Sequence, residues 1–239
     1  MRLCELTLPT PEENLACDEA LLDLCEAGDS EELLRLWAPQ QYFVVLGYAN
    51  KADTEVNLAF CRSHTIPVLR RCTGGGTVLQ GPGVLNYSLI LRINDSGPFR
   101  SISATNQFIL QRHRDALAAL LCAPVEWQGQ TDLAIGGLKF AGNAQRRRRR
   151  FLLFHGSFLL YLDLSLVEQA LPLPSRQPDY RADRSHTDFL INVNVPAPAI
   201  CAALIKAWDA TAPFAPIPLG QITRLAREKY SLDEWNLRF

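Results

Sequence analysis

The chain has 239 residues, of which 48% are hydrophobic and 21% charged, and its formal net charge is −1. This length can bury a full hydrophobic core, and the balanced charge excludes both a global basic field for nucleic acid and an acidic solvating tail. Neither a signal-peptide run nor a stretch of about 18 apolar residues occurs, so we expect a cytoplasmic protein without membrane spans or a nucleic-acid partner.

Residues 10–28 have the signals of a capped helix. Thr10 is a good N-cap, Pro11 suits the first helical position and Glu13 completes a capping box, while Gly28 is a stop signal. Hydrophobic patterning predicts four short elements after it, with a proline-containing turn joining the first two strands. These are strands at 32–38, 41–48 and 65–71, and a helix at 55–64.

Three consecutive glycines, Gly74 to Gly76, follow Arg70 and Arg71 and lead toward a strand at 83–93. Each glycine loses much chain entropy on folding, and a tight connection between strands needs only one or two. We therefore interpret the run as a backbone wall against which a ligand lies, with N–H groups available to an anion; a plain tight turn is the alternative. It is neither a phosphate loop nor a dinucleotide fingerprint, because no Gly-Lys-Ser/Thr follows and the loop enters a strand.

The rest of the chain alternates strands and helices. A helix is expected at 102–121, with Ile102, Phe108, Ile109, Leu117 and Leu120 on or near its buried side. Residues 124–145 indicate strand, turn, strand around the favoured hairpin pair Gly136-Gly137. Because the strands come in hairpin-like pairs with helices between groups, we predict an α/β (α+β) fold with mixed, largely antiparallel sheets flanked by helices. No linker divides the chain, so we expect one domain over 1–239. The remaining elements are a strand at 151–164, helices at 165–171, 197–211 and 220–230, and a loop-rich segment at 172–198.

Lys139 is one of four lysines in a chain with twenty arginines, and its neighbours are small or apolar. A strand lysine is often solvated. A compact ammonium in a partly desolvated pocket also suits a phosphate or a developing oxyanion, where a planar guanidinium fits less well. Asp132 is a candidate to pair with Lys139 or with a metal ion, and a turn aspartate is the alternative.

Three further patterns bear on the site. His155-Gly156-Ser157 interrupts an apolar strand, which indicates close approach of a ligand, although a satisfied core histidine is the alternative. The four histidines share no ligand spacing, so we expect no structural metal, and the seven scattered cysteines are typical of a reducing compartment. We expect residues 146–150, five arginines, to form a solvated hairpin tip; the alternative is a basic tip that meets an acidic partner or a triphosphate.

Six segments in order resemble the lipoate–protein ligase A and octanoyltransferase family, which is related to biotin–protein ligases. The resemblance covers nearly the whole chain and implies a class II synthetase or biotin–lipoyl ligase-like catalytic domain. The segments are "NLACDEALL" (14–22), "LRLWAPQQYFVVLGY" (34–48), "RRCTGGGTVL" with "NYSLIL" (70–79, 86–91), "TDLAIGGLKFAGNAQRR" (131–147), "HGSFLLYLDL" (155–164) and "REKYSLDEWN" (227–236).

This resemblance implies an ATP-dependent ligase that converts lipoate or octanoate to acyl-AMP and transfers the acyl group to a lysine of a lipoyl carrier domain. Lys139 would be catalytic and would contact the acyl carbonyl and phosphate, and Mg²⁺ bound with ATP would lie near Asp132. The other residues that the resemblance places at the acyl-AMP site are Arg71, Thr73, Gly74, Gly75, Gly76, Thr77, Val78, Asn86, Asp132, Gly142, Asn143, His155 and Ser157.

The chain departs from the family pattern in two places. Gln80-Gly81 stands where ligases commonly have His-Asp, and the chain ends where a C-terminal accessory domain often begins. We therefore expect either a separate accessory subunit or a lid formed by 174–189, whose Arg176, Arg181 and Arg184 would meet phosphates.

Two rival functions remain. A transferase that moves octanoyl or lipoyl groups between carriers would need a nucleophilic cysteine, but "WQGQT" (127–131) has none and none occurs between 123 and 200. Cys72 and Cys122 match no nucleophile position of the family. A ligand-binding homologue without catalysis is the other rival, and the retained Lys139 and glycines weigh against it.

Overall fold

The computed structural model describes residues 1–28 and 31–239. Within them, one sheet has eight strands in the order β11-β1-β2-β6-β10-β9-β8-β7, and a smaller one has the order β4-β3-β5. The strands are β1 (Arg2–Glu5), β2 (Leu33–Trp37), β3 (Phe43–Leu46), β4 (Val68–Arg70), β5 (Val78–Gln80), β6 (Val84–Arg92), β7 (Glu126–Gln128), β8 (Asp132–Ile135), β9 (Leu138–Arg147), β10 (Phe151–Leu159) and β11 (Ala212–Pro213). The helices are α1 (Pro11–Ala27), α2 (Ala52–Glu55), α3 (Leu58–Ser63), α4 (Ile102–Leu121), α5 (Leu164–Ala170), α6 (His186–Phe189), α7 (Ala197–Trp208), α8 (Leu219–Leu225) and α9 (Asp233–Asn236), with a 3-10 turn η1 (Asp179–Arg181) and a π-helical turn η2 (Ala226–Tyr230).

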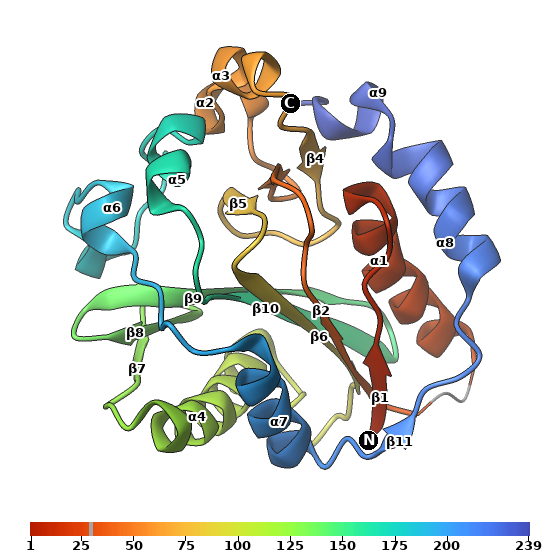
Figure 1. The fold of residues 1–239 in the computed structure, drawn as a ribbon. Helices are drawn as coiled ribbons and strands as arrows, with labels where there is room; N and C mark the ends of the chain where they lie inside the picture. The colour runs from red at the N-terminus through yellow and green to blue at the C-terminus, as the bar shows by residue number, and fades with distance from the viewer. Residues whose placement is uncertain (29–30) are drawn as a thin grey trace.

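Helices cover both faces of the large sheet (Figure 1). The helices α4 and α7 pack on one face over an apolar core that includes Leu89, Phe154 and Phe158. A second core lies between the other face, α1 and the α8–η2 segment, and a third surrounds the small sheet with α5. In the large sheet, β2, β6, β10, β9, β8 and β7 pair with their neighbours in antiparallel fashion, and β1 is parallel to both β2 and β11. The predicted mixed, largely antiparallel sheet with flanking helices is confirmed.

Local signals set the boundaries of α1 and of the β8–β9 turn. The Thr10 hydroxyl accepts from the Glu13 backbone N–H at 3.2 Å, and the Glu13 carboxylate accepts from the Thr10 N–H at 3.1 Å, so the predicted capping box is present. Gly136 and Gly137 have φ of +57° and +73°. Such left-handed pairs match the twist of antiparallel strands, and only glycine adopts them without strain.

Three sequence predictions need correction. The strands β2 and β3 do not pair as a hairpin, because β2 joins the large sheet and β3 the small one. The segment 124–145 holds three strands rather than two, since β7 pairs with β8 before the glycine turn. Ile102, predicted near the buried side of its helix, is 57% exposed because α4 buries the face that carries Ile109 and Leu117.

Candidate functional site

One face of the large sheet carries two rows of cross-strand neighbours, and most of the predicted strand residues lie in them. Strand register defines both rows. The first row contains Trp37, Asn86, Ser157, Gly142 and Asp132, and the second contains Arg35, Ser88, His155 and Ala144. Side chains of paired residues share a face, and this is the face covered by α1 and by the glycine loop. We call it the site face.

Lys139 reaches the site face because of a β-bulge. The register between β8 and β9 shifts so that Ala141 and Lys139 oppose consecutive residues of β8, which leaves Phe140 as an extra residue. An extra residue reverses the alternation of side chains along a strand. Lys139 therefore lies on the same face as Gly142, while Phe140 is fully buried in the apolar core beneath the sheet.

The ammonium of Lys139 lies across Gly142 and bonds to Asp132. Its Nζ is 2.8 Å from Asp132 Oδ1, and the Tyr180 hydroxyl donates to Asp132 Oδ2 at 2.8 Å. A Cβ placed on Gly142 would lie 2.9 Å from both Cε and Nζ of Lys139, so a side chain there would displace the ammonium from this position. Lys139 is one-quarter exposed, and it is therefore partly desolvated and still accessible.

The glycine loop is fixed from behind by Arg71. The guanidinium donates to the carbonyls of Gly74 at 2.7 Å and Gly76 at 2.8 Å, and its Nε donates to Thr73 Oγ1 at 3.0 Å. Burial lowers the pKa of Arg71 to about 10, which leaves it charged at neutral pH. Because Arg71 takes loop carbonyls on the inner side, it acts as a scaffold for the loop rather than as a free cation.

The outer side of the glycine loop is open. A Cβ built on Gly74 or Gly76 meets nothing within 4 Å, whereas Gly75 has φ +90° and its Cβ would lie 2.8 Å from Arg71 Nη2. The same Cβ would be 3.5 Å from Ala144 Cβ, so the loop lies over β9 beside Lys139's neighbour Gly142. Ala144 and Gly142 are two residues apart, about 6.6 Å along the strand, so the loop and the Lys139 ammonium lie over neighbouring parts of β9.

A chain of hydrogen bonds links the glycine loop to the helix α1. Thr73 Oγ1 is 2.7 Å from His155 Nε2, and His155 Nδ1 is 3.1 Å from Asp18 Oδ2. Asp18 Oδ1 accepts from the fully buried Arg35 at 2.6 Å. Burial alone raises the pKa of Asp18, but Arg35 and the bond from His155 outweigh it, so that pKa lies below its ordinary value.

The arginine run at 146–150 is not a freely solvated tip. Arg146 reaches inward to the Cys72 carbonyl at 3.2 Å and to the buried Glu19, which also accepts from Lys229 at 2.6 Å. The carboxylate of Glu26 accepts from the backbone of 149–151, and the guanidinium of Arg150 donates to the Glu26 carbonyl at the end of α1. The tip is therefore bonded to α1, which corrects the sequence prediction.

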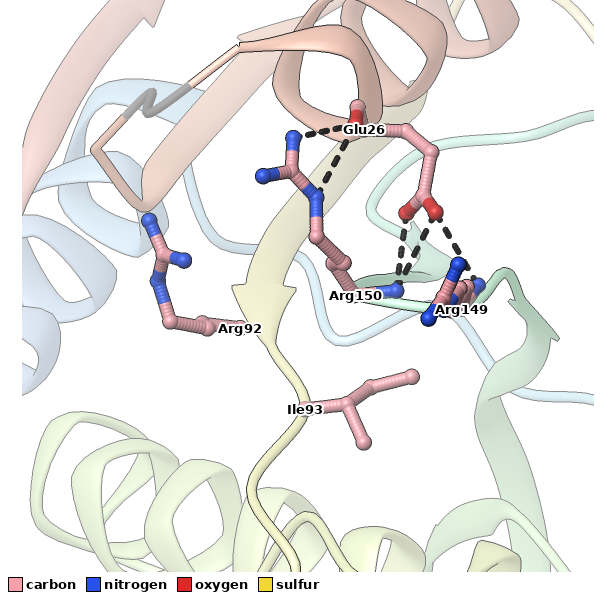
Figure 2. Close-up of a pocket in the computed structure, with 5 residues that line it drawn as sticks. All are labelled: Glu26, Arg92, Ile93, Arg149 and Arg150. Carbon is pink, nitrogen blue, oxygen red and sulfur yellow. Dashed lines mark hydrogen bonds between the residues drawn. The ribbon is translucent and has the colours of Figure 1, made fainter.

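Figure 2 shows the cavity next to this tip. It has a volume of about 480 Å³ and is lined by Glu26, Arg92, Ile93, Arg149 and Arg150. It lies at the Phe151 end of β10, and His155 and Ser157 lie further along the strand toward the glycine loop. The cavity is therefore separate from the site face.

Asn143 is the predicted site residue that the structure moves elsewhere. Its Oδ1 accepts from Tyr87 at 2.5 Å, and its Nδ2 donates to the Thr131 carbonyl at 2.6 Å. A Cβ on Gly156 would collide with Asn143 Oδ1, so this side chain lies on the face opposite to His155. Residues 142 and 143 point to opposite faces, so the Asn143 side chain lies away from the site face, and its part in acyl-AMP binding stays a prediction.

The other predicted residues divide between supporting and open positions. Asn86 is buried and donates to Gln80 Oε1 at 2.9 Å. Gln80, which stands where ligases of the family commonly have histidine, therefore makes a buried polar contact. Thr77 Oγ1 is buried and lacks a hydrogen-bond partner among residues 1–28 and 31–239. Val78 packs at the edge of the α1 core. Ser157 is half-buried on the site face.

The predicted lid arginines are largely committed. Arg181 is buried, donates to the Arg184 carbonyl at 3.0 Å and stacks on Phe189. Arg184 donates to the Tyr180 carbonyl at 2.7 Å and to Gly137. Both hold the segment in shape, so the expectation that all three arginines are available to phosphates is wrong, and only Arg176 is exposed.

Three functional candidates were missed by the sequence reasoning. Asp18, Arg35 and Tyr180 each bond directly to a predicted site residue or to its partner. A signal was present for one of them, because Asn14 and Asp18 sit one turn apart on the buried face of α1, where unpaired polar groups are costly. Tyr180 lies in the short 3-10 turn η1, where no periodicity marks a position.

The residues do not offer a ready metal site. Both oxygens of Asp132 are bonded, and no group of three metal-binding side chains occurs within the described parts of the chain. Magnesium needs free carboxylate or phosphate oxygens. As arranged, Asp132 is paired with Lys139 and Tyr180, and a Mg²⁺ ion near it stays a prediction that depends on bound ATP. In the same residues, none of the helices has both the length and the apolar character needed to cross a membrane.

These features define a class of protein: mixed α/β catalytic domains in which a glycine loop and a lysine share one face of the central sheet. The chain belongs to the lipoyl protein ligase A/B catalytic-domain family, whose model matches residues 10–194. Relatives of the chain include lipoate ligases and octanoyltransferases, so the chain belongs to a family of enzymes.

The relatives include both activities. The chain is 28% identical to lipoate-protein ligase A subunit 1 of Thermoplasma acidophilum, over 94% of this chain and 91% of that protein. It is also 28% identical to the octanoyltransferase LipM of Geobacillus kaustophilus, over 95% of this chain and 94% of that one.

Solved structures of lipoate protein ligases have the same fold as this chain. A bipartite lipoate protein ligase from T. acidophilum, described with its E2 lipoyl domain, superposes with a TM-score of 0.82 at 25% identity, over 99% of this chain and 95% of that one. A lipoate-protein ligase A bound with ATP superposes with a TM-score of 0.81 at 25% identity, over 99% and 98%.

Proposed function

We propose that the protein is a lipoate–protein ligase that activates lipoate or octanoate with ATP and transfers the acyl group to a lysine of a lipoyl carrier domain. The observation that carries the proposal is that Lys139 and the open glycine loop lie on the same face of the large sheet. The ATP-bound relative and the relative described with a lipoyl domain support the choice of substrates. Seven free cysteines are consistent with a reducing, cytoplasmic setting.

The glycine wall would hold the acyl carboxylate and the α-phosphate. Arg71 takes the carbonyls of Gly74 and Gly76 on its own side, so loop N–H groups are left for oxygen atoms of the ligand. In the first step, a carboxylate oxygen attacks the α-phosphorus of ATP, the bond to pyrophosphate breaks, and acyl-AMP forms. Mg²⁺ would enter with the phosphates of ATP, as a counter-ion of the substrate rather than as a resident ion.

Lys139 would stabilise negative charge in both steps. Its ammonium, released from or shared with Asp132, would approach the phosphate during activation and the acyl carbonyl oxygen during transfer. In the second step, the carrier amine attacks the acyl carbon, AMP leaves with the bonding electrons, and the extra proton of the amine goes to solvent. Tyr180 and Asp132 would hold the ammonium in position between turnovers.

Substitutions at the glycines test this assignment. Gly74→Ala and Gly76→Ala place a methyl group in open space, so the fold should stay intact while the ligand loses its place against the backbone. We expect thermal unfolding within a few degrees of wild type and loss of lipoate binding by at least about tenfold in titration calorimetry. Wild-type binding by both variants would show that no ligand lies against the loop.

Octanoyl transfer between carriers is the second candidate, and it is favoured by the similarity to octanoyltransferase LipM. The two functions differ in their need for ATP. A ligase should release pyrophosphate in the presence of ATP, Mg²⁺ and octanoate, and should modify a carrier domain. A transferase should modify the carrier from an octanoylated donor without ATP, through an enzyme-bound acyl group.

If the chain alone releases no pyrophosphate, addition of a second protein tests the predicted accessory subunit. The relative named subunit 1 of a ligase provides the reason for that arm.

A further inference from the structure

We propose that Asp18, His155 and Thr73 form a positioning chain that sets the glycine loop for acyl binding, and that His155 acts through the loop without touching the ligand. The inference rests on the proposed function, because it assigns a role in the binding of the acyl acid. It gives Asp18 and Arg35 a role in the site. It also changes the predicted role of His155 from contact with acyl-AMP to positioning of the loop.

The direction of every hydrogen bond in this positioning chain follows from the arginines at its two ends, Arg35 and Arg71. Arg35 is fully buried and can only donate, so Asp18 Oδ1 is an acceptor at 2.6 Å. Asp18 Oδ2 then accepts from His155 Nδ1 at 3.1 Å. A neutral imidazole with its proton on Nδ1 has an acceptor at Nε2, so Asp18 selects the tautomer of His155.

The same logic continues into the loop. His155 Nε2 accepts the hydroxyl proton of Thr73 at 2.7 Å, which leaves Thr73 Oγ1 to accept from Arg71 Nε at 3.0 Å. The remaining Arg71 donors hold the carbonyls of Gly74 and Gly76. The orientation of the loop carbonyls, and hence of the N–H groups on its open side, is therefore connected by one set of bonds to a buried ion pair in α1 and β2.

Hydrogen bonding within the protein explains why His155 is not itself a ligand contact. The imidazole is 14% exposed, whereas Thr73 is 1% exposed, so what limits the ring is the engagement of its nitrogens rather than burial. Both ring nitrogens of His155 are already used. The glycines that follow Thr73 are exposed. The positioning chain therefore ends next to a part of the loop that a ligand can reach, while the nitrogens of its histidine are already engaged.

Thr73→Val and Thr73→Ser provide the matched pair for a test. Valine keeps the shape of threonine but removes the hydroxyl, which leaves His155 Nε2 and Arg71 Nε without this partner. Serine keeps the hydroxyl. We expect Thr73→Val to raise the Kd and KM for octanoate and for lipoate by at least about tenfold and by the same factor for both acids, with kcat changed less than threefold. Thr73→Ser should remain within threefold of wild type in all of these.

A second perturbation guards against a variant that does not fold. His155→Gln retains one donor and one acceptor and is expected to remain folded, with a weakened chain and an intermediate Kd. The double variant His155→Gln, Thr73→Val should bind no more weakly than Thr73→Val alone, because both act through the same bonds. Additive losses would overturn the proposal, as would a change of Kd that differs between lipoate and octanoate, since direct contact would depend on the ligand.

Calorimetric binding of octanoate separates this inference from the proposed function. If wild-type protein binds neither octanoate nor lipoate, the proposed function fails. If wild type binds and Thr73→Val binds equally well, the positioning chain fails while the ligase proposal stands. Lys139→Ala is the control, because it should lose acyl transfer and still bind octanoate within a few-fold of wild type.

Discussion

Gly142→Ala should disable the enzyme by moving a side chain that the substitution does not alter. The new methyl group would lie 2.9 Å from Cε and Nζ of Lys139, while ordinary contact begins at 3.4 Å. The end of the lysine must therefore retreat by at least about 0.5 Å, away from the position in which it bonds to Asp132. The backbone at Gly142 does not need a left-handed conformation, so alanine is tolerated there.

The expected magnitudes differ for stability and for turnover. Stability should change by no more than about 1 kcal/mol, because a lysine end moves easily and alanine also lowers the entropy of the unfolded chain by about 0.4–1 kcal/mol. A misplacement of about 1 Å in a catalytic group costs on the order of 100-fold in rate. For a shift of about half that size we expect a loss of roughly tenfold to 100-fold in kcat, smaller than the loss in Lys139→Ala.

The assay is octanoyl transfer to a lipoyl carrier domain, followed by mass spectrometry, with thermal unfolding measured on the same samples. Gly220→Ala is the matched control, because a Cβ at Gly220 in α8 meets nothing within 4 Å. It should keep wild-type kcat. Full activity of Gly142→Ala alongside an inactive Lys139→Ala would refute the reasoning, since the ammonium would then not need the space over Gly142.

Three more predictions use other features. Lys139→Ala and Lys139→Arg should both lose acyl transfer by about 100-fold or more while keeping the fold, because the wider guanidinium cannot take the place of the ammonium; turnover near wild type in either variant would remove Lys139 from the mechanism. The double variant Cys72→Ser, Cys122→Ser should keep its activity, since burial raises the pKa of Cys72 to about 11; an acyl group labile to neutral hydroxylamine on the native protein would favour a transferase. Burial lowers the pKa of His113 to about 3. The unfolded chain therefore takes up a proton near pH 6.5 that the folded chain takes up only near pH 3. The free energy of unfolding should fall by roughly 4 kcal/mol as the pH is lowered between these two values. Urea unfolding from pH 7 to pH 4 should show a flatter dependence in His113→Gln, whose amide can still accept from Trp208, and identical slopes would contradict the buried neutral histidine.

The sequence was most informative where the decisive forces are local. The capping box at Thr10 and the left-handed glycine pair at 136–137 depend on residues within one turn, and both were predicted correctly. Strand partners are set by distant segments. Residues 32–38 and 41–48 read as strands, but only the packing of two separate cores decides that they enter different sheets.

The same limit applies to the direction of the Asn143 side chain. A strand pattern with strict alternation would place Lys139 and Asn143 on one face, and the extra residue Phe140 separates them. Nothing in "GGLKFAGNAQ" marks the bulge, because it arises from the register with β8 rather than from a turn signal. The sequence therefore singles out Lys139 as a candidate, and the structure places Gly142 rather than Asn143 on the same side of the sheet.

Position 72 bears on the choice between ligase and transferase more than any resemblance does. A carrier-to-carrier transferase must hold the acyl group on a nucleophile within reach of the glycine loop. Cys72 precedes the loop, but its thiol is buried with a raised pKa, and Cys122 ends α4 beneath the other face of the sheet. The Thr73 hydroxyl is committed to His155 and Arg71. Because those groups are unsuited to carry the acyl group, we favour the ligase, in which cleavage of ATP would supply the free energy for amide formation and Lys139 the positive charge.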